Sequence, residues 1–182
     1  MKWAGIASFA AVALALGTAG AAAQWRSEAV LGATLGRLRA SASSSTAPGF
    51  TAILGFGSRS LVFGPEFIWQ NGDSLRVRGF AVGVRIRQPG GVIHPHLMAS
   101  LGAYAWQSRL IVTIPDVAVV GLVPWSEITY LSGSLGAGLT VGRLDQGLSG
   151  VLEGRWHRNL SQNADAGPRS LIAVMAGLRV AW

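Results

Sequence analysis

The sequence predicts an all-β fold: an eight-stranded antiparallel up-and-down β-barrel that crosses a membrane. Half of the 182 residues are hydrophobic and only 13% are charged, against roughly 25% in a typical soluble domain. Several stretches alternate apolar with small or polar residues at a period of two, which is the period of a strand. The connections between these stretches alternate between tight turns and longer loops, as they do in bacterial outer-membrane barrels.

The first 23 residues have the pattern of a secretory signal peptide. Lys2 gives a positive start, an alanine-rich apolar run covers 5–16, and the alanines at 21–23 supply a cleavage site. An uncleaved membrane anchor is the alternative, but the run is short and built from small residues. We therefore expect residues 1–23 to be removed and residues 24–182 to form the barrel domain.

Eight strands are expected after the signal. They cover 27–39, 49–57, 60–70, 75–87, 92–107, 129–143, 149–160 and 171–182. Tight turns are expected at 58–59, 88–91 and 144–148, and longer loops at 40–48, 108–128 and 161–170, with the short loop 71–74 as an exception. Short turns face the periplasm in outer-membrane barrels. Both termini are therefore expected on the periplasmic side of a bacterial outer membrane.

Each predicted strand has one apolar face and one small, polar or charged face. In the last strand, Ile172, Val174 and Leu178 share one face and Arg179 lies on the other. A secreted soluble barrel of the lipocalin kind is the competing interpretation, but it would carry its charges outward, and this chain has too few to cover that surface. We expect the apolar face to contact lipid and the other face to line the lumen.

Continuing the alternation places seven charged side chains in the lumen. They are Glu28, Glu66, Arg85, Arg87, Glu153, Arg155 and Arg179. An isolated ion in a narrow interior is costly, whereas ions that hydrogen-bond each other are tolerated. An eight-stranded barrel also leaves an interior that side chains can just fill. We expect a salt-bridge network rather than an open pore, with a gated solute path as the alternative.

Aromatic residues near strand ends are expected to mark the two membrane interfaces. This set comprises Trp25, Trp69, Trp106, Trp125, Trp156, Tyr130 and Trp182. The chain ends in Trp182 after an alternating strand, which resembles the C-terminal strand that the barrel-assembly machinery of the outer membrane recognises. The resemblance implies that Trp182 is an assembly signal and that this machinery is a partner during biogenesis.

Two further stretches resemble the small outer-membrane β-barrel domain family, which includes OmpA-type and opacity-type barrels. Residues 94–104, HPHLMASLGAY, are similar to a family strand in which a proline precedes spaced glycines and a final aromatic residue. Residues 152–161, LEGRWHRNLS, are similar to its charged penultimate strand. The resemblance covers the mature chain as a pattern, and it implies an architecture more than an activity.

An enzyme is the second function that the sequence suggests. Lipid A deacylases of the PagL type are also eight-stranded, with a membrane-facing Ser–His pair and an acidic residue. His157 and Ser161 lie at the outer end of the seventh predicted strand, and a hydroxyl beside an imidazole can be activated for acyl transfer. The spacing departs from that family, because Asn159 stands where it has its serine and Asp165 is the only later acid.

Other chemistry has little support. His94 and His96 share a strand face, but no third ligand is near, so no metal is expected, and no cofactor motif is present. The net charge of +7 in a secreted barrel favours outer-membrane lipids, lipopolysaccharide phosphates included, over nucleic acid as the anionic partner. Arg76 and Arg78, near the outer end of the fourth strand, either meet anionic headgroups or are simply solvated.

The loop 108–128 contains two apolar runs, 110–114 and 117–120, on either side of Pro115-Asp116. This pattern predicts a hairpin above the membrane, and its exposed sheet edge is a candidate surface for a protein partner. A ten-stranded barrel that includes both runs is the alternative. As a whole, the sequence predicts a non-enzymatic, porin-like outer-membrane protein with a structural or surface-interaction role carried by its extracellular loops. A PagL-like lipid A deacylase is the second candidate.

Overall fold

The computed structural model describes residues 25–40, 44–73, 75–108, 111–113, 120–122, 126–161 and 168–182. The elements in these ranges are the strands β1 (Arg26–Ala40), β2 (Ser44–Gly57), β3 (Leu61–Asn71), β4 (Leu75–Arg87), β5 (Ile93–Ser108), β6 (Ile111–Thr113), β7 (Val120–Leu122), β8 (Ser126–Gly142), β9 (Gly147–Asn159) and β10 (Pro168–Ala181). The expected signal peptide at 1–23 and Trp125 lie outside the described residues. Within the described ranges, no helix is long and apolar enough to cross a membrane.

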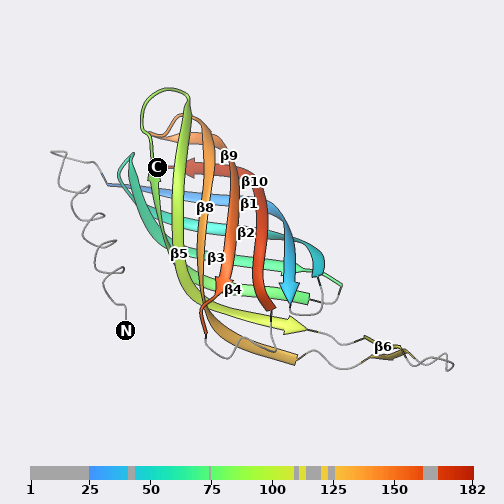
Figure 1. Ribbon diagram of the computed structural model, residues 1–182. Helices are drawn as coiled ribbons and strands as arrows, with labels where there is room; N and C mark the ends of the chain where they lie inside the picture. Colours follow the sequence, from blue (N-terminus) through green and yellow to red (C-terminus); the bar gives the residue numbers. More distant parts are fainter. Residues whose placement is uncertain are drawn as a thin grey trace.

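Eight of these strands close into one antiparallel barrel (Figure 1). Their order around the barrel is β1-β10-β9-β8-β5-β4-β3-β2, and β1 closes the sheet by pairing with β10. β6 and β7 pair with each other in a two-stranded sheet outside the barrel. The prediction of eight barrel strands is therefore confirmed. The ten-stranded alternative is wrong, because the two short strands form a sheet of their own.

The start of β1 and the C-terminus meet at one end of the barrel (Figure 1). The backbones of Ser27 and Trp182 exchange two hydrogen bonds there, with N–O distances of 3.1 and 3.0 Å. We call this end the terminal end. The opposite end, from which β6 and β7 extend, is called the loop end.

Side chains alternate between an apolar outer face and a mostly small or charged inner face. On β9, Leu152 and Trp156 are 52% and 42% exposed, whereas the residues that follow them, Glu153 and His157, are buried. Leu97 on β5 is 66% exposed in the same way. A soluble barrel buries its apolar side chains and exposes its charges. The reverse arrangement seen here is that of a transmembrane β-barrel.

Three strands begin three or more residues earlier than the sequence predicts. β2 starts at Ser44, so 44–48 continue the pairing with β1 instead of forming a loop. Pro48 is tolerated there because β2 pairs with β3 only from Gly49 onward, and proline fits an unpaired strand edge. β8 starts at Ser126 and β10 at Pro168, which lengthens two further hairpins at the loop end.

Apolar and aromatic side chains fill the lumen near the loop end. Trp106 and Tyr130 belong to this buried cluster and are 1% and 7% exposed. The prediction that they lie in an interfacial belt is therefore wrong. Trp106 shares the inner face of β5 with Ser100 and Tyr104. The two-residue period of the strand, and not the nearby strand end, determines which way its side chain points.

Candidate functional site

The candidate site is the interior of the barrel, where seven charged side chains meet. Glu28 lies on β1, Glu66 on β3, Arg85 and Arg87 on β4, Glu153 and Arg155 on β9, and Arg179 on β10. None of them is more than 4% exposed. Each lies on the inner face of its strand, because successive side chains of a strand point to opposite faces.

Glu28 accepts hydrogen bonds from three arginines. Arg87 donates to both carboxylate oxygens, at 3.1 and 2.9 Å, Arg85 Nη1 donates at 3.2 Å, and Arg179 Nε donates at 2.6 Å. Arg179 also donates to the backbone carbonyl of Leu144 in the turn between β8 and β9, at 2.9 Å. One carboxylate thus connects β1, β4, β10 and, through Arg179, a turn at the terminal end.

Arg85 links Glu28 to the second half of the network. Its Nη2 donates to Glu153 Oε1, and Glu153 Oε2 accepts from Arg155 Nε and Nη2 at 3.0 and 2.8 Å. Arg155 Nη1 then donates to Glu66 Oε2 at 2.8 Å. The ion pairs therefore form a continuous chain across the lumen, in the order Glu28, Arg85, Glu153, Arg155 and Glu66.

Neutral polar groups extend this chain. His96 Nε2 lies 3.1 Å from Glu153 Oε1, Ser100 Oγ donates to Glu66 Oε1 at 2.5 Å, and Ser134 Oγ lies 2.6 Å from the Ser100 hydroxyl. The sequence alone does not assign these residues to the network. A neutral side chain gives no charge signal, and inward parity alone does not say which carboxylate it reaches.

The two histidines of the 94–96 segment serve different contacts. His94 Nδ1 lies 3.1 Å from the carbonyl oxygen of Gln88, and its Nε2 lies 2.9 Å from that of Gly142. His96 contacts Glu153 instead. Among the residues that the structure describes, no group of three or more His, Cys, Asp or Glu side chains is placed to hold a metal ion.

A glycine makes room for the charged side chains. Gly138 of β8 pairs with Glu153 of β9. A Cβ atom at Gly138 would lie 2.7 Å from Glu153 Cγ and 2.8 Å from His96 Nε2, which is closer than real Cβ contacts allow. The long charged side chains of β9 therefore fit because the facing position on β8 has no side chain.

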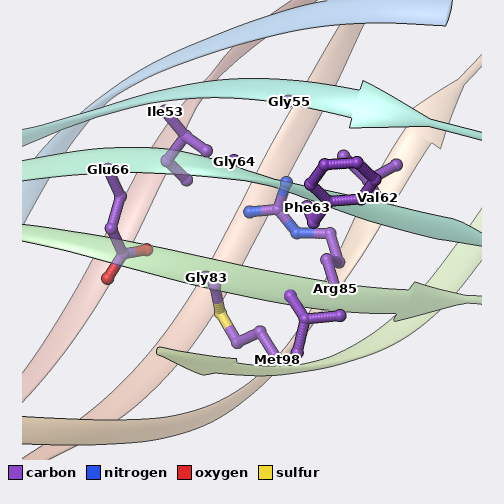
Figure 2. Close-up of a pocket in the computed structure, with 10 residues that line it drawn as sticks. Ile53, Gly55, Val62, Phe63, Gly64, Glu66, Gly83, Arg85 and Met98 are labelled. Carbon is purple, nitrogen blue, oxygen red and sulfur yellow. The ribbon is translucent and has the colours of Figure 1, made fainter. Parts of the chain in front are cut away.

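Little empty space remains beside the network. Figure 2 shows Glu66 of β3 and Arg85 of β4 projecting into the same part of the interior, with Ile53 and Met98 beside them. The hollow that these residues line measures about 20 Å³. Such a volume holds about one water molecule, so ionic side chains rather than solvent occupy this part of the lumen.

The bonding pattern limits what the network can do chemically. Four guanidiniums and three carboxylates give a net charge of 4 − 3 = +1. All six carboxylate oxygens accept at least one hydrogen bond. A carboxylate used in this way is poorly placed to act as a general acid or base. The arrangement is suited to joining strands and filling the lumen.

His157 and Ser161, the residues of the deacylase hypothesis, are not brought together. His157 is fully buried on the inner face of β9, and neither of its ring nitrogens has a hydrogen-bond partner. Its ring contacts that of Tyr104 edge to face, with centroids 5.6 Å apart. Ser161 lies beyond the end of β9, where its backbone N–H donates to Asn159 Oδ1 at 2.9 Å. Asp165 is outside the described residues.

Four tryptophans face outward near the two ends of the barrel. At the terminal end, Trp182 is 64% exposed and Trp25 packs edge to face on Phe63, with ring centroids 5.5 Å apart. Trp69 and Trp156, near the loop end, are 40% and 42% exposed. Outward aromatic side chains near both ends of the barrel are the pattern of the two aromatic girdles of transmembrane barrels.

A closed eight-stranded barrel with an apolar exterior and an ion-paired interior has the architecture of a small transmembrane β-barrel. No family model and no curated protein matches the sequence. Solved structures match its fold. Neisserial surface protein A is 12% identical, with a TM-score of 0.65 over 86% of this chain and 96% of that chain.

Two other solved barrels are similar over nearly their whole length. Ail, the attachment invasion locus protein of Yersinia pestis, in complex with the heparin analogue sucrose octasulfate, is 12% identical, with a TM-score of 0.57 over 87% of this chain and 99% of Ail. The N-terminal β-barrel domain of Pseudomonas aeruginosa OprF is 13% identical, with a TM-score of 0.52 over 87% of this chain and all of that domain. These likenesses confirm the predicted fold, a closed eight-stranded antiparallel up-and-down barrel.

Proposed function

We propose that the protein is a non-enzymatic bacterial outer-membrane barrel with a closed lumen, whose extracellular loops carry a structural or surface-interaction role. One observation carries the proposal. The apolar residues face outward and the buried ions pair with one another inside, so the exterior suits hydrocarbon and the interior is filled. The names of two similar barrels, a surface protein and an attachment protein, are consistent with a role at the cell surface.

The proposed orientation places the terminal end in the periplasm and the loop end outside the cell. The tight turns after β4 and β8 lie at the terminal end, and such barrels have short periplasmic turns. Trp182 is then the assembly signal that the barrel-assembly machinery reads. Residues 1–23 are the cleaved signal peptide, and the segment 108–128 is the candidate contact for a protein partner.

Membrane fractionation and gel mobility test the proposal. We expect the mature chain to be found in the outer-membrane fraction and to require detergent for solubility. We also expect it to migrate differently on a gel before and after heating. Recovery of a folded monomer from plain buffer without detergent would contradict it, because an apolar band of this kind cannot stay exposed to water.

The lipid A deacylase hypothesis is tested separately. Mass spectrometry of lipid A from cells with and without the protein is expected to show the same acyl chains. If an acyl chain disappears with the protein present, and a His157→Ala variant restores it while remaining in the outer membrane, the protein is an enzyme and the non-enzymatic proposal fails.

A further inference from the structure

The outer face carries arginines that the lumen network does not use. Arg37 and Arg39 end the outer face of β1, following the exposed residues Leu31 and Leu35 along the strand, and Arg158 lies near the end of the outer face of β9. All three arginine side chains are exposed. We call Arg37, Arg39 and Arg158 the outer arginine patch.

Strand register places the three patch residues close together. β10 lies between β1 and β9, and its Ser170 pairs with Arg39 on one side and with Arg158 on the other. Adjacent strands are about 4.8 Å apart, so the backbones of Arg39 and Arg158 are roughly 10 Å apart. Arg37 lies about 7 Å from Arg39 along the same strand. Only the small side chain of Ser170 lies between Arg39 and Arg158 on the outer face.

The chain supplies no anion for the patch within its described residues. No ion pair there involves Arg37, Arg39 or Arg158. Arg78, an outward arginine of β4 near the same end, contrasts with them, because its Nη2 donates to both oxygens of Glu127 at 2.9 and 2.8 Å. Adjacent cations without a counter-charge repel one another, so an external anion would relieve the patch.

The position of the patch selects the kind of anion. Arg37 follows Leu35, which is 58% exposed in the apolar band, by about 7 Å along the strand. Arg158 follows Trp156 in the same way, with its Cζ 6.0 Å from the centroid of the indole ring. An anion bound there lies where acyl chains end and headgroups begin. One guanidinium group can donate two parallel hydrogen bonds to two oxygens of a phosphate, which favours a phosphorylated headgroup.

We propose that the outer arginine patch binds the phosphates of an anionic glycolipid headgroup in the outer leaflet of the membrane. The inference rests on the proposed function, because the patch reaches that leaflet only in a barrel that spans the outer membrane with its loop end outward. Arg39 and Arg158 hold the phosphate between them across β10, and Arg37 faces the hydrocarbon side of the same headgroup.

The test measures binding of fluorescently labelled lipopolysaccharide to the mature chain in detergent. Arg39→Gln with Arg158→Gln is expected to weaken binding about tenfold or more, since two charge-assisted contacts are lost. Arg78→Gln, which removes one positive charge near the same end, is expected to change binding by less than about twofold because Glu127 already neutralises Arg78. Enzymatically dephosphorylated lipopolysaccharide is expected to bind the wild type as weakly as the intact lipid binds the double variant.

Several results would overturn the inference. Equal binding by the wild type and the double variant would remove the patch from the interaction. An equal loss in Arg78→Gln would make the effect one of general charge, and full binding of dephosphorylated lipid would exclude phosphate as the recognised group. Competition by inorganic phosphate alone at equal phosphate concentration would show that no lipid headgroup is needed. Gel mobility before and after heating separates these results from a failure of the barrel assignment, since a chain that needs detergent to fold keeps the proposed function.

Discussion

Arg85 is the residue that makes the lumen network continuous, since it contacts both Glu28 and Glu153. Without it, Glu28 keeps Arg87 and Arg179, while Glu153 keeps Arg155 and His96. Each carboxylate of the network is therefore shared among several donors. Removing one member leaves its buried partners with too few opposite charges. This destabilises the fold more than removing both partners of a pair.

Glu153→Gln is expected to lower the free energy of unfolding by about 3 kcal/mol or more, because the buried Arg85 and Arg155 lose a charged acceptor. Urea unfolding in lipid vesicles, followed by tryptophan fluorescence, measures the change. Glu127→Gln is the control, since Glu127 also accepts from an arginine but lies exposed at the loop end. An equal decrease in the free energy of unfolding in both variants would mean that burial does not increase the contribution of these ion pairs to stability.

Gly138→Ala is expected to destabilise the barrel by about 1–3 kcal/mol, the usual range for overpacking, because the new methyl group meets Glu153, His96 and the backbone of Leu152. Gly154→Ala is the control on the neighbouring strand. A Cβ there meets only Ala137 O, at 4.0 Å. The same unfolding measurement compares them, and a Gly138→Ala variant as stable as Gly154→Ala would contradict a tightly filled lumen.

At the scale of elements, the β5–β8 pair is the longest hairpin of the barrel, and β6 and β7 continue from it as a separate sheet. Ser108 and Ser126 are the last paired residues of β5 and β8. The barrel ladder is thus complete without the segment between them. The barrel strands therefore stabilise the fold, whereas the segment between Ser108 and Ser126 is not needed for the barrel pairing.

Replacing 109–125 by Asn-Gly, a two-residue turn that fits between paired strand ends, is expected to leave the barrel intact. The urea midpoint and the gel shift on heating should match those of the full chain, with a change in stability within about 0.5 kcal/mol. Replacing 144–146 in the β8–β9 turn by glycines is the comparison and is expected to destabilise the barrel, because it removes the buried Leu144 side chain and the Asp145 carboxylate that pairs with Arg26 and Arg59. Loss of folding in the first variant alone would show that the barrel depends on the outer hairpin.

For the whole molecule, the paired charges and the apolar cluster near the loop end together close the interior. Purified protein in planar lipid bilayers is therefore expected to show no stepwise ion conductance. The Glu66→Ala, Arg155→Ala double variant removes both partners of one ion pair, so no charge is stranded from that pair. The apolar cluster near the loop end stays in place in this variant, so it is also expected to show no stepwise conductance. Large conductance steps in the wild type would instead support the gated solute path.

The sequence was sufficient to predict the strands and the inward direction of seven charges, because alternation at a period of two is a local property. It was insufficient for the pairing of Arg155 with Glu66 rather than with Glu28, since partners across a barrel depend on register summed over many strands. Trp106 differs from its prediction for another reason. Its proximity to a strand end suggests the membrane interface, but its alternation with Tyr104 on the same face directs it into the lumen.

The outer arginine patch also has a consequence for how the chain enters its membrane. In the proposed orientation, Arg37, Arg39 and Arg158 must traverse the bilayer once, and an arginine at the hydrocarbon midplane costs about 2–4 kcal/mol, so the three together cost roughly 6–12 kcal/mol. The same penalty opposes the return journey. Once inserted, the barrel is therefore slow to leave, and the three exposed cations hold it at the depth where they reach the headgroups.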